Sequence, residues 1–303
     1  MSTKLPAEIE SAVQPLLDAQ GGIGSVQFLA LPRLVPDHVE KAVVFTPEAR
    51  PALLVMIAPS AYPDCVRDAF HRAQAARLAL GGPVGEAVQV ALCTGVTEGQ
   101  SFAVVPYLTP PARGRLRRRW ERLLLGGPAL AWLREVTRRT VAVPPEGSQV
   151  EGFFEPLRAL STQPAVSERV RDAARSSMQA LEAGRWQPRW VLAHNDLWIG
   201  NLLRRRSRPA GTPGFAVIDW GGSLVCGYPF YDLLTMATSV HLPAASLRRE
   251  LRQHCALLGC EPAHARDHLL AALGAMSLRL GQWPVERFAA AAHQFVTVMD
   301  EAR

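Results

Sequence analysis

The sequence has few lysines, few asparagines and no long apolar run. It contains only two lysines, Lys4 and Lys41, and only two asparagines, Asn195 and Asn201. Its longest apolar runs, such as Ala52 to Ala58, are far too short to cross a bilayer. We therefore expect no membrane span, and a rare residue type that falls inside a motif becomes informative.

The cysteines offer neither a disulfide framework nor a zinc site. There are five of them, an odd number, and no pair has the short spacing of a zinc or redox motif. The first residues lack a basic start followed by an apolar core, so we expect no secretory signal. These features predict reduced thiols in a cytoplasmic protein.

Acidic residues are outnumbered, which gives a formal charge of +6, and the excess is nearly all arginine. Arginines are dense at residues 113–122 and 204–208. The pattern predicts either two solvated surfaces or a surface that attracts an anionic substrate. No aromatic interleaving or nucleic-acid motif accompanies it, so we expect no nucleic-acid partner. The length of 303 residues allows two modest domains or one large one.

The first hundred residues predict a region of strands and two helices. Gly21-Gly22 ends the first helix, and this pair is either a helix stop or a turn that covers phosphates. The predicted helices are 5–20 and 63–80, and the predicted strands are 25–31, 41–46, 52–58, 87–93 and 101–107.

The composition changes at residues 108–111, which read Leu-Thr-Pro-Pro and predict a domain hinge. Beyond it the chain is expected to be mostly helical. The predicted helices are 115–125, 128–138, 153–160, 167–183, 230–239, 244–258, 263–280 and 284–301.

Two apolar runs in the second half each end in polar residues. One run, residues 191–193, leads into His194-Asn195-Asp196 and on to Asn201. The other, residues 215–218, leads into Asp219. Their connection, residues 204–214, is basic and rich in proline and glycine, so it predicts an exposed hairpin tip.

The polar residues of this stretch suit a metal that arrives with a nucleotide. Magnesium takes hard oxygen ligands and usually only one or two protein carboxylates. Asp219 offers a carboxylate and Asn201 a neutral amide oxygen, which is a poor set for zinc. Asp196 is then left to accept or orient the proton of an attacking hydroxyl. Protein kinases divide the chemistry in this way.

This stretch resembles the aminoglycoside phosphotransferase and choline kinase-like family at every defined position of its pattern. The pattern is His-x-Asp-x-x-x-x-Asn followed, after a hairpin, by an apolar residue, Asp and Trp or Phe. The segment from Gly227 to Leu233 also resembles the family. The resemblance implies an α+β fold that is bilobal and protein-kinase-like. A small β-rich N-lobe over residues 1–107 would cover the nucleotide, and a mainly helical C-lobe over residues 108–303 would carry the catalytic loop and the acceptor site.

The resemblance also implies roles for single residues. Asp196 resembles the catalytic base, and Asn201 and Asp219 resemble the ligands of Mg²⁺. His194 and Asp232 resemble residues that brace the loop. Trp198 and Trp220 are expected to pack, although either can edge the substrate pocket. The backbone of the interlobe hinge would meet the adenine ring of ATP, or the base of GTP, at Pro106, Tyr107 and Leu108.

The first lobe departs from the family at one ion pair. A lysine on the third strand normally holds the nucleotide phosphates and pairs with a glutamate on the next helix. Here that strand position is Met56, and residues 66–80 contain no glutamate. Lys41 can replace the lysine if its side chain faces the cleft. Other cations that can replace it are Arg33, Arg50, Arg67 and Arg72.

Two functions from different classes therefore stay open. The first is a kinase that moves the γ-phosphoryl of ATP or GTP to a small-molecule hydroxyl, which the intact Asp196, Asn201 and Asp219 favour. The second is a catalytically weak or inactive kinase-like binding protein, which the altered first lobe favours. A protein kinase is disfavoured because no long activation segment and no Ala-Pro-Glu follow Asp219.

The acceptor is expected to lie against the last helices, where acidic residues are sparse. A polycationic aminoglycoside would need many carboxylates there, and the protein is basic. We therefore expect a sugar- or nucleoside-like metabolite, with an aminoglycoside antibiotic as the alternative. The candidate polar residues of this wall are His241, His254, Glu261, His264, Asp267, His268, Arg279, Glu286 and Arg287.

Overall fold

The computed structural model describes residues 4–29, 38–110, 114–145, 148–205, 211–281 and 283–302. The chain divides into two compact units, each considered by itself. Unit 1 is Met1–Pro111 with Leu202–Gly222, and unit 2 is Ala112–Asn201 with Ser223–Arg303. Within the described ranges, every helix is too short or too polar to span a bilayer.

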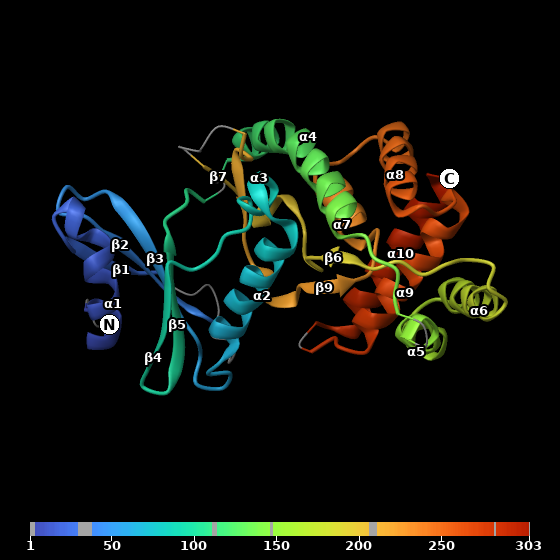
Figure 1. Cartoon of the computed structure of the whole chain (residues 1–303), viewed down its shortest axis with the longest axis horizontal. Coiled ribbons are helices and arrows are strands. Elements are labelled where there is room, and N and C mark those ends of the chain that lie inside the picture. Colours follow the sequence, from blue (N-terminus) through green and yellow to red (C-terminus); the bar gives the residue numbers. More distant parts are fainter. Residues whose placement is uncertain are drawn as a thin grey trace. The chain divides into compact units, whose positions relative to one another are not determined.

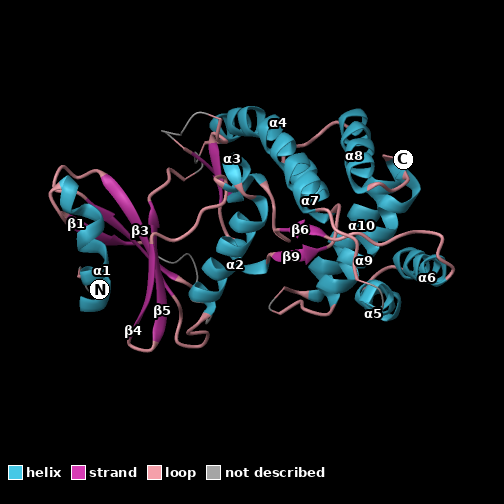
Figure 2. Cartoon of the chain, viewed as in Figure 1, coloured by secondary structure: helices cyan, strands magenta, loops and turns pink. Residues whose placement is uncertain are grey.

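Unit 1 is organised around an antiparallel sheet with the strand order β1-β2-β3-β5-β4 (Figures 1 and 2). Its strands are β1 (Ser25–Phe28), β2 (Glu40–Phe45), β3 (Pro51–Ile57), β4 (Cys93–Thr97) and β5 (Gln100–Pro106). Its helices are α1 (Ala7–Leu17), α2 (Cys65–Leu80) and the short α3 (Gly82–Gly85). A separate hairpin of β7 (Leu202–Arg204) and β8 (Phe215–Val217) belongs to the same unit.

Alternate side chains of β3 enter two different apolar clusters, as the period of a strand requires. Leu53 and Val55 pack in one cluster with residues of α1. Met56 packs in the other cluster, to which Val66 and Phe70 of α2 contribute. The two helices thus cover opposite faces of the sheet (Figure 1). Leu53 and Val55 of β3 therefore face α1, and Met56 faces α2.

Gly21 ends the first helix. It lies at φ 85°, in the left-handed region, and its N–H donates to the carbonyl of Asp18 after the 3₁₀ turn Asp18–Gln20. Of the two interpretations of Gly21-Gly22, the helix stop is confirmed.

The strand predicted at 87–93 is wrong. In its place α3 is followed by an irregular segment that pairs with β8 only at Val88–Val217, and β4 begins at Cys93. Ala87 and Val88 are both buried, so the segment lacks the alternation of a half-buried strand. The β1 prediction extends beyond Phe28 to residues 30 and 31, which lie outside the described ranges.

Unit 2 is mostly helical, with one small ladder of β6 (Val191–Ala193) and β9 (Leu224–Gly227). Its α-helices are α4 (Arg115–Thr140), α5 (Ser148–Thr162), α6 (Glu168–Glu182), α7 (Tyr231–Ser239), α8 (Ala244–Leu258), α9 (Ala265–Ser277) and α10 (Val285–Glu301). Short 3₁₀ turns lie at Ile199–Asn201 (η2) and Pro262–His264 (η4) in this unit, and at Trp220–Gly222 (η3) in unit 1.

Helix α4 is continuous, so the prediction of two helices at 115–125 and 128–138 is wrong. A proline inside a helix removes one hydrogen bond and costs about 3 kcal/mol. Pro128 is nevertheless tolerated in α4. Residues that follow it, such as Leu130, Trp132 and Leu133, are buried and keep the second half of α4 packed.

Helices α5 and α9 approach closely because Gly274 has no side chain. A Cβ at this position would lie 1.9 Å from the carbonyl oxygen of Pro156. Any larger residue would force the two backbones apart, so this glycine fixes the helix contact around which the core of unit 2 forms.

Two histidines of that core are neutral. His268 Nδ1 donates to the carbonyl of His264 at 2.9 Å, and His254 Nδ1 lies 3.0 Å from the hydroxyl of Thr137. The Nε2 atom of each ring is buried without a hydrogen-bond partner in the described residues. Burial lowers the pKa of both to about 4, with nearby Arg134 also lowering that of His254.

The stability of unit 2 should therefore fall in acid. A histidine whose pKa is lower in the folded chain binds protons more tightly when unfolded, so its contribution is complete above pH 6.5 and is lost towards pH 4. We expect a loss of about 3 kcal/mol per histidine over this window. Urea unfolding of His268→Phe between pH 7 and pH 4 should show a shallower decline than wild type. Exposed His293→Gln should decline like wild type, and identical slopes for all three proteins would refute the assignment.

Candidate active site

One carboxylate accepts several backbone hydrogen bonds from the loop that follows β6. Asp232, in the first turn of α7, accepts hydrogen bonds from the N–H of His194 at 2.6 Å and from the N–H of Asn195 at 2.9 Å. The Leu197 N–H is a further donor. Burial raises the pKa of Asp232, while His194 and these three N–H groups lower it. The carboxylate thus satisfies backbone donors that would otherwise be buried and unpaired.

His194 lies inside the same loop and does not face solvent. Its side chain is 2 % exposed, and its Nδ1 accepts the N–H of Asp196 at 3.3 Å. With Nδ1 accepting this N–H, the ring can carry a proton only on Nε2. The left-handed φ of 65° at Asn195 bends the chain between these two residues.

Asp196 and Asn201 are brought together across the loop. The Asn201 side-chain nitrogen donates to the Asp196 carbonyl at 2.8 Å and to Asp196 Oδ2 at 2.9 Å. Asp196 is exposed, whereas Asn201 is buried, at 6 % exposure. Both amide protons are thus committed to Asp196, and Asn201 Oδ1 has no hydrogen bond to a described residue.

The rest of the loop is fixed by α7 and by an indole. The Ile199 N–H donates to Ser239 Oγ at 3.1 Å, and the Asn201 N–H donates to the Trp198 carbonyl at 2.9 Å. The ring of Trp198 lies over Gly200 and is 45 % exposed, so it packs against the loop and not in the core.

Asp219 belongs to unit 1, where it follows β8. It is exposed and has a φ of 66°, a conformation that costs free energy in a residue other than glycine. Its neighbours are fixed on both sides. Trp220 is buried and its Nε1 donates to the Val217 carbonyl at 2.9 Å, while the Arg72 guanidinium of α2 donates to the Gly221 carbonyl.

The position that the resemblance assigns to the phosphate-binding lysine is Met56, and Lys41 stands beside it. Met56 packs against the cluster that contains Phe70 of α2, so strand and helix meet at this position through an apolar contact. On β2, Lys41 lies directly opposite Met56 in the antiparallel register. Opposed residues of antiparallel strands point to the same face, with Cβ atoms roughly 5 Å apart.

The other proposed substitutes are less well placed. Arg50 is exposed at the turn before β3, Arg67 pairs with Asp64 at 2.9 Å, and Arg72 is engaged by Gly221. Arg33 lies outside the described residues.

The segment that ends β5 keeps one backbone donor available. The Tyr107 N–H donates to the Ala52 carbonyl at 2.8 Å, and the Pro106 carbonyl accepts from Gln89 Nε2 at 3.2 Å. The N–H of Leu108 makes no hydrogen bond to a described residue.

Two residues expected to line an acceptor wall are wrongly assigned. His254 and His268 are 4 % and 0 % exposed, so they form part of the core and cannot contact a substrate. Asp267 also has a structural partner, because the hydroxyl of Ser177 donates to its Oδ1. Their helices were predicted, but which face of each helix points inward was not.

A five-stranded sheet flanked by helices in unit 1 and a helical unit 2 with this loop define a protein-kinase-like phosphotransferase. The chain belongs to the phosphotransferase enzyme family known as APH, whose model matches residues 34–286. It is thus a kinase of the class that acts on small molecules. No curated protein matches the sequence significantly.

Solved structures of low sequence identity share the fold. Aminoglycoside 2'-phosphotransferase-IIIa in its GDP complex is 17% identical, with a TM-score of 0.54, and 98% of this chain and 99% of that chain are covered. A thermostable variant of aminoglycoside phosphotransferase APH(4)-Ia, in complex with AMP-PNP and hygromycin B, is 13% identical, with a TM-score of 0.54 and coverage of 96% and 98%. A choline/ethanolamine kinase family protein from Mesorhizobium loti is 14% identical, with a TM-score of 0.52 and coverage of 96% and 93%.

The contribution of the Asp232 carboxylate to the free energy of unfolding should be measurable. Asp232→Asn replaces one acceptor oxygen by a donor that faces backbone N–H groups, so we expect the free energy of unfolding at pH 7 to fall by about 1–3 kcal/mol. The matched control is Asp172→Asn, which breaks a solvent-screened, exposed pair with Arg175 and should cost much less stability. Equal losses in urea titrations of the two variants would contradict the bracing role of Asp232.

Proposed function

We propose that the protein is a Mg²⁺-dependent kinase that transfers the γ-phosphoryl of ATP or GTP to a hydroxyl of a small molecule. The observation that carries the proposal is the hydrogen bonding of Asn201. Its amide nitrogen orients Asp196, which leaves its amide oxygen available for a metal. One side chain thus serves the base and the metal at the same time.

The residues present fit Mg²⁺. Asn201 Oδ1 and the exposed carboxylate of Asp219 are hard oxygen donors, and one or two protein ligands are usual when phosphates supply the rest. Leu202 pairs with Val217 in the β7–β8 hairpin, so Asn201 and Asp219 are attached to the same end of that hairpin. When bound, Mg²⁺ would neutralise charge on the phosphates.

Asp196 is the proposed catalytic base. Its carboxylate is exposed and oriented by Asn201, so it can accept the proton of the acceptor hydroxyl as that oxygen attacks the γ-phosphorus. His194 and Asp232 act through the backbone of the loop and are positioning residues.

Lys41 is the proposed phosphate-binding cation. It projects from the same face of the sheet as Met56, and a flexible lysine stem can place its ammonium near the position that a lysine at residue 56 would reach. Pro106, Tyr107 and Leu108 are the proposed base-binding segment, in which the Leu108 N–H is the open donor.

The proposed acceptor is a neutral or anionic hydroxyl compound of the sugar or nucleoside type. The basic charge of the chain supports this choice over a polycationic aminoglycoside. We also propose a cytoplasmic location, which is supported by the five cysteines, all described in the structure and none in a disulfide.

Removal of either proposed carboxylate should strongly lower the turnover rate. Consumption of ATP or GTP with Mg²⁺ would be followed over a panel of sugars, nucleosides, amino alcohols and aminoglycosides. We expect Asp196→Ala to lower kcat about 10²–10⁴-fold on the active acceptor while nucleotide binding persists. Asp219→Ala should lower kcat comparably and raise the Mg²⁺ concentration needed for half-maximal rate.

Exposed Asp68→Ala, on α2, is the matched control and should retain wild-type rates. Nucleotide binding by the wild type without turnover on any acceptor of the panel would favour a kinase-like binding protein. Wild-type turnover by Asp196→Ala would remove that residue as the base.

The proposed phosphate-binding role of Lys41 can be tested by removing this lysine and by moving it to position 56 on the neighbouring strand. Lys41→Met should raise the KM for the nucleotide about 10–100-fold, because a charge-assisted contact to phosphate is lost. The double variant Lys41→Met/Met56→Lys restores one cation on the same face, so we expect it to recover most of the lost affinity.

Lys4→Met, which removes the only other lysine, is the control and should leave the KM unchanged. An unchanged KM in Lys41→Met would assign the phosphates to another cation. Failure of the double variant to recover, with Lys41→Met impaired, would show that the two positions do not share a target.

A further inference from the structure

Unit 1 contains a cavity beside the end of β5. It has a volume of about 440 Å³, which is within the range of small-molecule sites. It shares the segment Pro106 to Leu108 with the proposed nucleotide site. Lys41, Met56 and Asp219 do not line it, so it is distinct from the residues assigned to phosphates and metal.

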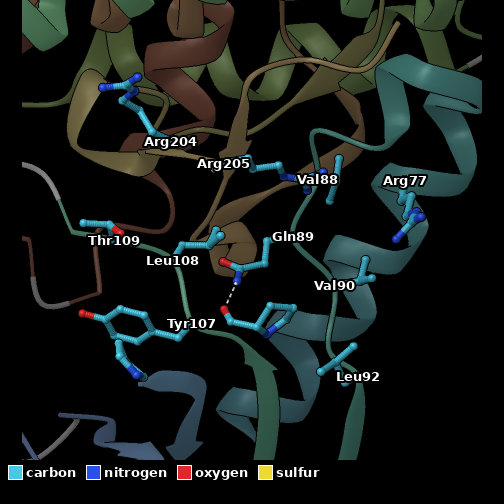
Figure 3. A pocket seen from close by; sticks show the side chains of 12 residues that line it. Arg77, Val88, Gln89, Val90, Leu92, Tyr107, Leu108, Thr109, Arg204 and Arg205 are labelled. Atoms are coloured by element: carbon cyan, nitrogen blue, oxygen red, sulfur yellow. Dashed lines mark hydrogen bonds between the residues drawn. The ribbon is translucent and has the colours of Figure 1, made fainter. Parts of the chain in front are cut away.

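The cavity has an apolar wall and a polar wall (Figure 3). Val88, Val90 and Leu92, from the irregular segment before β4, form one side. The side chain of Gln89, from the same segment, points towards Pro106 and donates to its carbonyl. The same segment is held to the β7–β8 hairpin by the hydrogen bond from the Gln89 N–H to the Val217 carbonyl, at 3.0 Å. The walls are thus built from three backbone segments tied to one another.

The polar wall carries an excess of positive charge. Arg77, Arg204 and Arg205 all line the cavity. Arg77 forms an ion pair with Glu86, which neutralises it. Figure 3 shows the side chain of Arg205, the residue after β7, running towards Val88. Arg204, the last residue of β7, is exposed and extends in another direction. Arg205 is therefore the partly buried cation of this wall that has no ion-pair partner, because no described carboxylate lies within ion-pair distance of it.

The environment of Arg205 disfavours its charge. The side chain is half-buried, and burial and Arg77 lower its pKa while Glu86 raises it. A partly buried guanidinium without an anionic partner loses hydration and gains little in return. An anion in the cavity would supply the missing partner, and a guanidinium binds carboxylate or phosphate oxygens well.

We propose that this cavity binds a small organic anion, with a carboxylate or phosphate on the Arg205 guanidinium and an apolar body against Val88, Val90 and Leu92. The ligand would contact the segment Pro106–Leu108 from the cavity, so a third compound, besides nucleotide and acceptor, has a place in the fold. The binding itself does not depend on the kinase activity proposed above.

Binding can be measured by calorimetry at low ionic strength with three probes, namely phenyl phosphate, benzoate and the neutral benzyl alcohol. We expect the wild type to bind at least one anion more tightly than benzyl alcohol. Arg205→Gln should weaken binding of that anion about 10–100-fold and leave benzyl alcohol unchanged. The control Arg50→Gln removes an exposed arginine outside the cavity and should bind like wild type.

A second variant tests the volume instead of the charge. Val90→Trp fills the cavity and should abolish binding of every probe that the wild type binds, with the fold of each variant checked by circular dichroism. Lys41→Met should bind the probes normally, which separates this cavity from the proposed phosphate site. AMP-PNP binding, measured in parallel, reports on the proposed function independently. Absence of anion binding, equal binding by Arg205→Gln and Arg50→Gln, or loss of binding in Lys41→Met would overturn the proposal.

Discussion

The conformation of the loop that follows β6 depends on one buried carboxylate, that of Asp232, which has a positioning role and not a catalytic one in the proposed reaction. Asp232 gathers the backbone N–H groups of His194 and Asn195, and the bend that they define delivers Asp196 to solvent. A loop of this kind exposes polar backbone to a protein interior, and each unpaired donor would cost about 1–3 kcal/mol. The helix that carries Asp232 is in turn packed in the core of unit 2. The packing of α7 in the core of unit 2 therefore fixes the conformation of the loop.

Unit 1 joins its sheet to α2 by apolar packing at the position where the resemblance implies an ion pair. Met56 and Phe70 join the sheet to α2 through a cluster that needs no counter-charge. The connection between α2 and the segment after Asp219 is polar instead, through Arg72 and the Gly221 carbonyl. The helix thus remains coupled to the segment that bears the proposed metal ligand, by a contact other than the usual one.

The sequence predicted elements best where caps and periodicity agree. Helix α8 was predicted at its observed bounds because Pro243 and Gly259 flank an amphipathic stretch. The prediction of a strand at 87–93 was wrong because an apolar run does not show whether, or with which strand, the segment pairs. The pairing of Lys41 with Met56 could not be predicted either. It depends on a register shift between Val44 and Phe45, and a slip of one residue would turn Lys41 to the opposite face. The motif located the loop, but the burial of His254 and His268 depends on helix packing that single-sequence periodicity does not report.

The hydrogen bonds of Asn201 explain why an amide, and not a third carboxylate, occupies this position. A carboxylate would be the stronger ligand for a divalent cation when judged alone. Here, however, the group must present two protons to Asp196 on one side and a lone pair on the other. Aspartate carries no protons to present at neutral pH, and its charge would repel that of Asp196 across the 2.9 Å contact. The identity of residue 201 is therefore set by the polarity of its neighbour as much as by any metal.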